Sequence, residues 1–146
     1  MKRVLVDTNV LISLVTDRNA AQQARAAALF ERAEAGDVTL LMHQIVLSEL
    51  VDVLTNLYRQ EPIAIAQLLD DLLASPNVRA IDEVTWAIVL DLWPTRVRDF
   101  ADAVLTAVAQ QQRCDAIATF DQRFVKQLRR AGHAAWWPDG DTHTAE

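Results

Sequence analysis

VLVDTNVLI, at residues 4–12, is the stretch of sequence that decides the fold. Its first three residues form an apolar run typical of a buried strand, and Asp7 ends that run. The apolar residues 10–12 then predict the buried side of a short helix over residues 8–15. Asp7 is therefore expected at the carboxyl end of a strand, where open α/β sheets place their ligands. A second interpretation remains open, in which Asp7 only caps the helix that follows it.

Segments typical of strands and helices alternate along the rest of the chain. This alternation predicts an α/β fold, in which helices cover a mostly parallel sheet of four to five strands. We expect one domain over residues 1–137 and a polar tail over residues 138–146, because no linker or internal repeat divides the chain. Strands are predicted at 3–6, 38–42, 78–81, 116–119 and 134–137, and helices at 8–15, 19–35, 43–58, 62–73, 83–93, 99–112 and 121–131.

Composition excludes several classes of protein. Half of the 146 residues are apolar, with only 3 Gly and 4 Pro, which favours an ordered, helix-rich protein. No apolar run approaches the roughly 20 residues that cross a bilayer, so we expect a cytoplasmic protein that does not enter a membrane. The net charge of −6 argues against a general nucleic-acid coating protein. It still permits a nuclease, because bound divalent cations supply positive charge locally.

The charge is distributed unevenly, and basic residues concentrate in one late segment. Two interpretations of this segment remain open, a solvated helix face and a rim that contacts phosphates. The four tryptophans are expected in the core or in an interface rather than as platforms for nucleobases. The basic residues of 113–130 are Arg113, Arg123, Lys126, Arg129 and Arg130, set against Asp115 and Asp121.

Three further acids recur in settings that resemble that of Asp7. Glu49 lies at the edge of the apolar stripe of its helix, where a carboxylate is costly unless it is paired, metal-bound or turned to solvent. Asp102 follows Asp99 by three residues, a spacing that also fits a capping pair at a helix start. Asp121 repeats the order of apolar strand, hydroxyl residue, acid and helix, and it too could serve only as a cap.

These acids matter most as a set. The carboxyl ends of parallel strands meet at one edge of a sheet, so Asp7 and Asp121 can converge, and Glu49 and Asp102 can join them from helices. Four carboxylates in one pocket repel one another and raise their pKa values unless a cation is present. Oxygen-only ligands select Mg²⁺ or Mn²⁺, and such a site activates water against a phosphodiester.

Four pieces of the chain resemble the PIN-domain ribonucleases, and within that family the VapC-type toxins of bacterial toxin–antitoxin modules. They occur in the family's order and extend across nearly the whole chain. They are VLVDTNVLI at 4–12, SELVDVL at 48–54, DFADAVLTAVA at 99–109 and ATFDQRF at 118–124.

The resemblance implies a three-layer α/β/α fold and a Mg²⁺- or Mn²⁺-dependent endoribonuclease. It implies a dimer that a cognate antitoxin holds inactive, offering an Arg or Lys to the acidic pocket. Asp7 and Asp102 would be the principal metal ligands, while Glu49 and Asp121 would complete the pocket and position the water. Auxiliary positions are Thr8, Asn9, Asp99 and Thr119, and candidate contacts to RNA phosphates are Arg96, Arg98 and Arg123.

Other functions compete with this one. An aspartate-nucleophile phosphohydrolase resembles the first motif but has a second Asp two residues on, where this chain has Asn9. A housekeeping PIN-domain nuclease that processes RNA would use the same acids, and an antitoxin gene beside this one would favour the toxin. A non-catalytic PIN-like binding module would not need all four acids.

Overall fold

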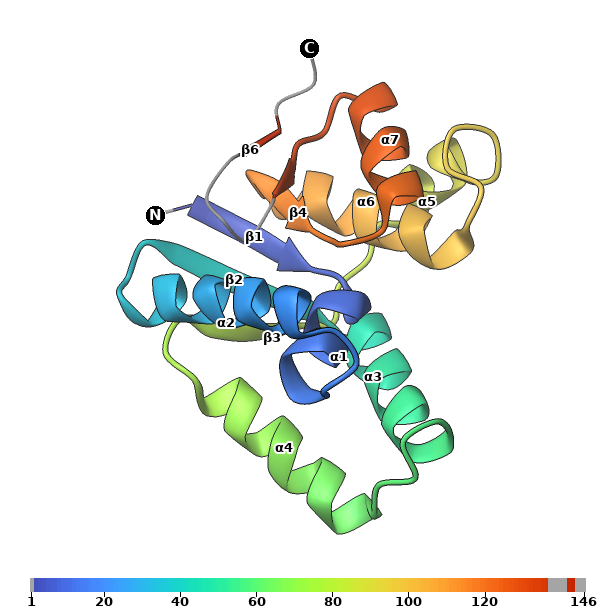
Figure 1. Ribbon diagram of the computed structural model, residues 1–146. Helices are drawn as coiled ribbons and strands as arrows, with labels where there is room; N and C mark the ends of the chain where they lie inside the picture. The colour runs from blue at the N-terminus through green and yellow to red at the C-terminus, as the bar shows by residue number, and fades with distance from the viewer. Residues whose placement is uncertain (1, 137–141, 144–146) are drawn as a thin grey trace.

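The computed structural model of this protein describes residues 2–136 and 142–143 (Figure 1). The strands are β1 (Lys2–Val6), β2 (Val38–His43), β3 (Val78–Ile81), β4 (Ala116–Ala118), β5 (Ala135–Trp136) and β6 (Thr142–His143). The helices are α1 (Thr8–Val15), α2 (Ala20–Glu34), α3 (Gln44–Asn56), α4 (Pro62–Ala74), α5 (Trp86–Leu92), α6 (Phe100–Gln111) and α7 (Gln122–Arg130).

The strands form one sheet in the order β3-β2-β1-β4-β5-β6. The first five run parallel and β6 pairs antiparallel with β5. The mostly parallel α/β architecture expected from the sequence is thus confirmed. The sheet has one strand more than expected, since β6 lies within residues 138–146, for which a polar tail is predicted. Two residues are too short a strand to produce a sequence pattern, and residues 138–141 and 144–146 of that segment lie outside the described part.

The connections divide the helices between the two faces of the sheet. The chain moves from β1 to β2 to β3 in one direction, then returns past β1 to β4 and β5. Right-handed crossovers therefore place α1–α4 on one face and α5–α7 on the other. Figure 1 shows these two groups of helices on either side of the strands. The strand order consequently reverses between β1 and β4, and the crevice at such a reversal is where α/β folds bind ligands.

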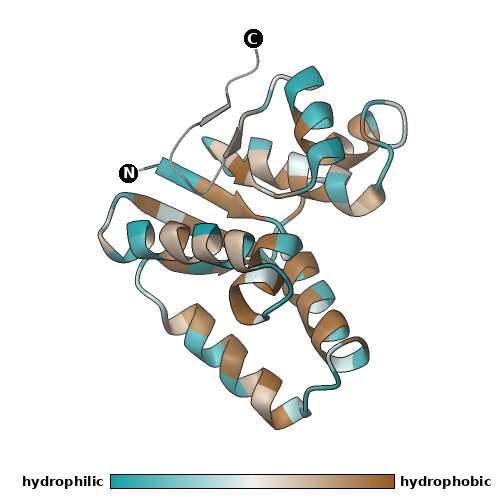
Figure 2. Cartoon of the chain, viewed as in Figure 1, coloured by the Kyte–Doolittle hydropathy of each residue, from teal (hydrophilic) through white to brown (hydrophobic). Residues whose placement is uncertain are grey.

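The core lies around β1 and β2, which are buried on both faces. Their apolar residues are almost fully inaccessible, as expected of parallel strands that helices cover on both sides. Figure 2 shows hydrophobic residues on β1 and β2 and on the helices that cover them, such as α1 and α3, whereas α7 is largely hydrophilic. No helix in residues 2–136 combines the length and the apolar character needed to cross a membrane.

Most predicted element boundaries agree with the structure within two residues, and α5 is the exception. The helix expected from residue 83 begins only at Trp86. Residues 83–85 are instead held by contacts outside the helix: Glu83 O lies 3.1 Å from His43 Nε2, and Thr85 Oγ1 donates to Gln111 Oε1. These tertiary hydrogen bonds hold residues 83–85 outside the helix, where the β-branched Val84 and Thr85 also have low helix propensity.

Candidate active site

Asp7 and Asp121 lie at the carboxyl ends of the two strands that flank the reversal of strand order. Asp7 follows β1 and caps α1, accepting a hydrogen bond from Thr8 N at 2.8 Å. Asp121 follows β4 and caps α7, accepting from Arg123 N at 2.9 Å. Each carboxylate therefore caps a helix, as one interpretation of the sequence proposed, and also lines the crevice, as the other did.

The carboxylate of Asp7 is held in place by polar side chains from both strand ends. Its Oδ2 accepts hydrogen bonds from Asn9 Nδ2 at 3.0 Å and from Thr119 Oγ1 at 2.8 Å. Asn9 also accepts from Phe120 N at 2.9 Å, and Thr119 Oγ1 accepts from Asp121 N at 3.1 Å. This network fixes the buried carboxylate in one orientation and ties the loop after β4 to the start of α1.

Glu49 reaches the same crevice from α3. Glu49 is exposed, yet its Oε2 accepts a hydrogen bond of 2.9 Å from Thr8 Oγ1. Thr8 thus serves both acids: its backbone N–H donates to Asp7 and its hydroxyl donates to Glu49. The carboxylate of Glu49 is directed into the crevice by this contact, although the edge of the apolar stripe left an outward orientation equally open.

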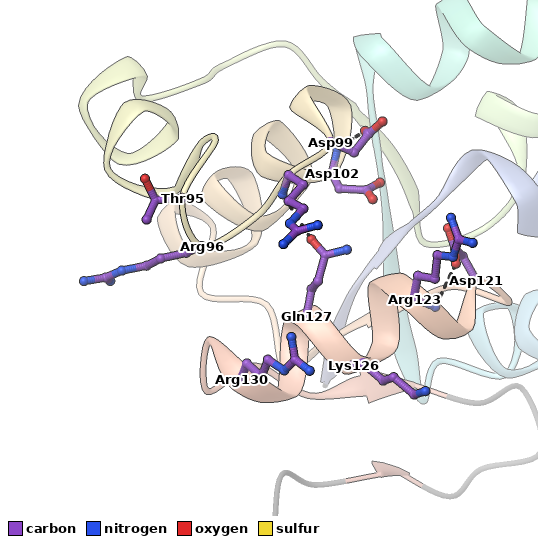
Figure 3. A pocket seen from close by; sticks show the side chains of 10 residues that line it. Thr95, Arg96, Asp99, Asp102, Asp121, Arg123, Lys126, Gln127 and Arg130 are labelled. Atoms are coloured by element: carbon purple, nitrogen blue, oxygen red, sulfur yellow. Dashed lines mark hydrogen bonds between the residues drawn. The ribbon is translucent and has the colours of Figure 1, made fainter.

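Asp102 joins the crevice from the first turn of α6. Asp99 caps that helix by accepting a hydrogen bond from Asp102 N at 3.0 Å, so the predicted capping pair is present. Among the described residues, none donates a hydrogen bond to the carboxylate of Asp102. Figure 3 shows this carboxylate directed across the cavity towards α7. The capping contact uses only the backbone of Asp102, which leaves its side chain available for chemistry.

One cavity of about 410 Å³ is lined by all four predicted acids, together with Asp99, Thr8 and Asn9. A second cavity of about 620 Å³ shares Asp99, Asp102 and Asp121 with the first and extends along α7. The candidate RNA contacts Arg96, Arg98 and Arg123 line this second cavity. Thr119, the remaining auxiliary residue, lies behind Asp7 and is buried.

Burial and mutual repulsion weaken the acidity of two of these carboxyls. Burial raises the pKa of Asp7 to about 6, against hydrogen bonds from Thr119 and Thr8 that lower it. Burial also raises the pKa of Asp102 to about 7, and the charges of Asp7, Asp99, Asp121 and Glu49 add to the rise. Raised pKa values are expected of carboxylates that share a buried site without a compensating positive charge.

The donor set fits a hard divalent cation. In the described part of the chain, no Lys or Arg forms an ion pair with any of the four acids, and only oxygen atoms face the cavity from them. The four carboxylates are not yet close enough together to coordinate one ion. Residues 2–136 contain no group of three or more His, Cys, Asp or Glu at metal-binding distances. The carboxylates share one cavity and repel one another, and small side-chain rotations around a cation would relieve that repulsion.

Several cavity residues were missed from the sequence. Arg18 lines the acidic cavity, donating from Nη2 to Asn9 O at 2.9 Å and to Ser13 Oγ at 3.0 Å. Gln127 lines the basic cavity beside Lys126 and Arg130, two of the basic residues for which a rim that contacts phosphates was one of the two interpretations of the sequence. Arg18 follows a helix end and gives no periodic signal. The residues of α7 do have a signal, since they recur at helical spacing on the face opposite the apolar residues.

A sequence profile of the PIN domain matches residues 4–128. The chain belongs to the PIN-domain family. This PIN domain therefore has the nuclease fold expected from its four motifs, and all four acids lie within the matched region. A search of curated protein sequences finds no match to the chain.

Solved structures share the fold at low sequence identity. VapC20 of Mycobacterium tuberculosis, described as a sarcin–ricin loop cleaving toxin, superposes with a TM-score of 0.64 at 23% identity, covering 92% of this chain and 99% of its own. PAE2754 from Pyrobaculum aerophilum has a TM-score of 0.58 at 19% identity, covering 86% of both chains. The PIN domain endonuclease Utp24 has a TM-score of 0.52 at 18% identity, covering 91% of this chain and 82% of its own.

Proposed function

We propose that this PIN domain is a Mg²⁺- or Mn²⁺-dependent endoribonuclease, and that it acts in the cytoplasm as the toxin of a toxin–antitoxin pair. The observation that carries this proposal is the position of the four acids. They lie where an acidic cavity meets a basic one, which suits a site that binds cations beside a polyanion. The VapC20 likeness, at the level of fold, agrees with an RNA-cleaving role.

Asp7 and Asp102 would hold the cation, and Glu49 and Asp121 would complete its surroundings. When bound, the cation lowers the pKa of a coordinated water and stabilises the charge on the phosphate under attack. A bound cation would also favour the ionised forms of Asp7 and Asp102, against the burial and the repulsion that raise their pKa values.

The protein's own groups would orient the reactants. Thr119 and Asn9 hold the Asp7 carboxylate still by hydrogen bonds to Oδ2, so little ordering remains when the substrate arrives. Thr8 holds Glu49, whose exposed carboxylate can accept a hydrogen bond from the attacking water. Asp121 is fixed by the two backbone N–H groups at the start of α7.

Arg98 and Arg123 would contact RNA phosphates from the basic cavity. Arg96 is less available than these two, because it pairs with Asp91 at 3.6 Å. Figure 3 shows its side chain extended away from the other labelled residues of the cavity. The contribution of Arg96 to RNA binding is therefore expected to be the smallest of the three.

The expected partners are also proposals. An antitoxin would place an Arg or Lys in the acidic cavity, where four carboxylates offer it strong charge-assisted hydrogen bonds. For the expected homodimer, α5 and the start of α6 offer an apolar surface. Its exposed members are Trp86, Leu90, Trp93 and Phe100. Patches of this kind mark surfaces for association.

Bacterial growth after induced expression without any partner tests the toxin role. Arrest by the wild type, and growth with Asp7→Asn, would support a toxin that depends on the acidic site. Equal arrest by both would contradict catalysis and favour toxicity by binding alone. No arrest by either would favour an RNA-processing nuclease, an alternative that the likeness to the PIN domain endonuclease Utp24 keeps open.

A further inference from the structure

The two cavities that meet at the acids differ sharply in charge. Five cationic side chains line the basic cavity, and these are Arg96, Arg98, Arg123, Lys126 and Arg130. Among the residues that the structure describes, Arg18 is the single cationic side chain lining the acidic cavity. Its guanidinium is already engaged by Asn9 O and Ser13 Oγ. An RNA strand that crosses the acids would therefore meet positive charge on one side of them and almost none on the other.

The basic side is built on one face of α7. At about 100° per residue, positions 123, 126, 127 and 130 fall within roughly 100° of one another around the helix. The buried residues Phe124, Val125 and Leu128 occupy the opposite face. Arg129 falls between these two faces, is exposed and does not line the cavity. Arg129 and Arg130 are thus neighbours with the same charge, and of these two only Arg130 lines the cavity.

The cationic groups of this face are free to bind an anion. In residues 2–136, no acidic side chain forms an ion pair with Arg98, Arg123, Lys126 or Arg130. Figure 3 shows Arg123, Gln127 and Arg130 along α7, facing the start of α6 where Asp99 and Asp102 lie. Gln127 Oε1 accepts from Arg98 N at 3.3 Å, which ties the wall carrying Arg98 to α7.

We propose that RNA is held asymmetrically across the acids, with its phosphates on one side of the scissile bond bound by Lys126 and Arg130. This inference rests on the proposed function and adds two positioning residues to it. Nucleotides on the other side enter the acidic cavity, whose walls include Ile12, Ile45 and Val46. In the described part of the chain, these walls provide no free cation. Affinity therefore comes from one side of the cut, and it is electrostatic and independent of sequence.

Salt dependence of binding tests the roles of Lys126 and Arg130. The probe is a fluorescein-labelled single-stranded RNA of mixed sequence, bound to the Asp7→Asn protein with Mg²⁺ present so that no cleavage intervenes. Adding Lys126→Gln and Arg130→Gln should lower the slope of log affinity against log salt by about 0.7 for each phosphate that is no longer neutralised. Arg129→Gln, on the same helix, should leave the slope unchanged. Equal effects of Arg129→Gln and Arg130→Gln would overturn the proposal.

Truncated RNAs test the asymmetry. Once the cut made by the wild type is mapped, the probe is shortened from its 5′ side or from its 3′ side. One truncation should abolish the effect of Lys126→Gln and Arg130→Gln, and the other should preserve it. Equal loss from both sides would overturn the asymmetry while leaving the nuclease intact. A wild type that neither cuts nor binds RNA would instead contradict the proposed function itself.

Discussion

The buried charge of Asp7 should cost this protein stability, and Asp7→Asn should recover part of it. Asp7 is only 8% exposed, and the pKa of its carboxyl rises from 3.8 to about 6 on folding. Each pKa unit is worth about 1.36 kcal/mol, so the ionised form costs the folded protein about 3 kcal/mol relative to the protonated form. Asparagine is neutral and nearly the same size, but it cannot accept all three hydrogen bonds that reach the two carboxylate oxygens, because an NH2 donor replaces one of those oxygens.

The pH dependence separates these two effects. The unfolded chain releases the Asp7 proton near 3.8 and the folded protein releases it near 6. Wild-type stability therefore falls as the pH rises through this window, and the loss is complete above the folded pKa. The asparagine variant lacks this titration. Its free energy of unfolding, relative to the wild type, should increase by about 3 kcal/mol across the window, whatever the missing hydrogen bonds cost.

Urea denaturation of both proteins with EDTA, over a series of pH values, measures this difference. Asp70→Asn, which removes an exposed carboxylate from α4, controls for the change in net charge. A difference between wild type and Asp7→Asn that stays constant from pH 3.8 to above 6 would refute the account of a desolvated, repelled carboxylate.

The remaining predictions concern the metal, the site, the core and the dimer. Mg²⁺ or Mn²⁺ at about 100 times its Kd should stabilise the wild type by about 2.7 kcal/mol at neutral pH, and should stabilise Asp7→Asn far less. The shift in melting temperature measures this stabilisation, and equal shifts for both proteins would argue against Asp7 as a ligand. Thr8→Val should slow cleavage severalfold through loss of its hydrogen bond to Glu49, worth about 1 kcal/mol, and Thr8→Ser should restore the rate. Phe124→Ala should lower the free energy of unfolding by about 3–5 kcal/mol, measured by urea denaturation, because Phe124 is completely buried. Leu90→Glu should convert the proposed dimer to a monomer by light scattering, and an unchanged mass would exclude this surface as the interface.

Much of the site was predictable from the sequence, because the positions of its acids relative to strand ends and helix starts can be found along the chain. An acid directly after an apolar strand places Asp7 at the carboxyl edge, an acid three residues after the end of β4 places Asp121 there, and a parallel sheet brings those strand ends together. The three-residue spacing of Asp99 and Asp102 likewise predicts the observed cap. Their roles in catalysis stay predictions, since the geometry establishes only that these side chains share a cavity.

Other features depend on tertiary packing and had no local signal. Arg18 follows the end of α1 and reaches the acidic cavity by donating a hydrogen bond back to Asn9 O, in the first turn of the same helix, and no periodicity encodes that contact. The tryptophans were expected in the core or an interface, and an exposure of 55% places Trp86 outside the core. Its ring stacks on that of Phe100, with centroids 6.1 Å apart, so it belongs to the surface patch rather than the core. The side chain of Trp136 and all of Trp137 lie outside the described part.

Cleavage of RNA by the purified protein tests the central claim most directly. Wild type and Asp102→Asn are incubated with total bacterial RNA in Mn²⁺ or Mg²⁺, and again in EDTA, and the new RNA ends are mapped by sequencing. We predict discrete cuts by the wild type with metal, and none in EDTA or by Asp102→Asn. Cuts that persist in EDTA, or in Asp102→Asn, would contradict a metal-dependent nuclease that works through these four acids.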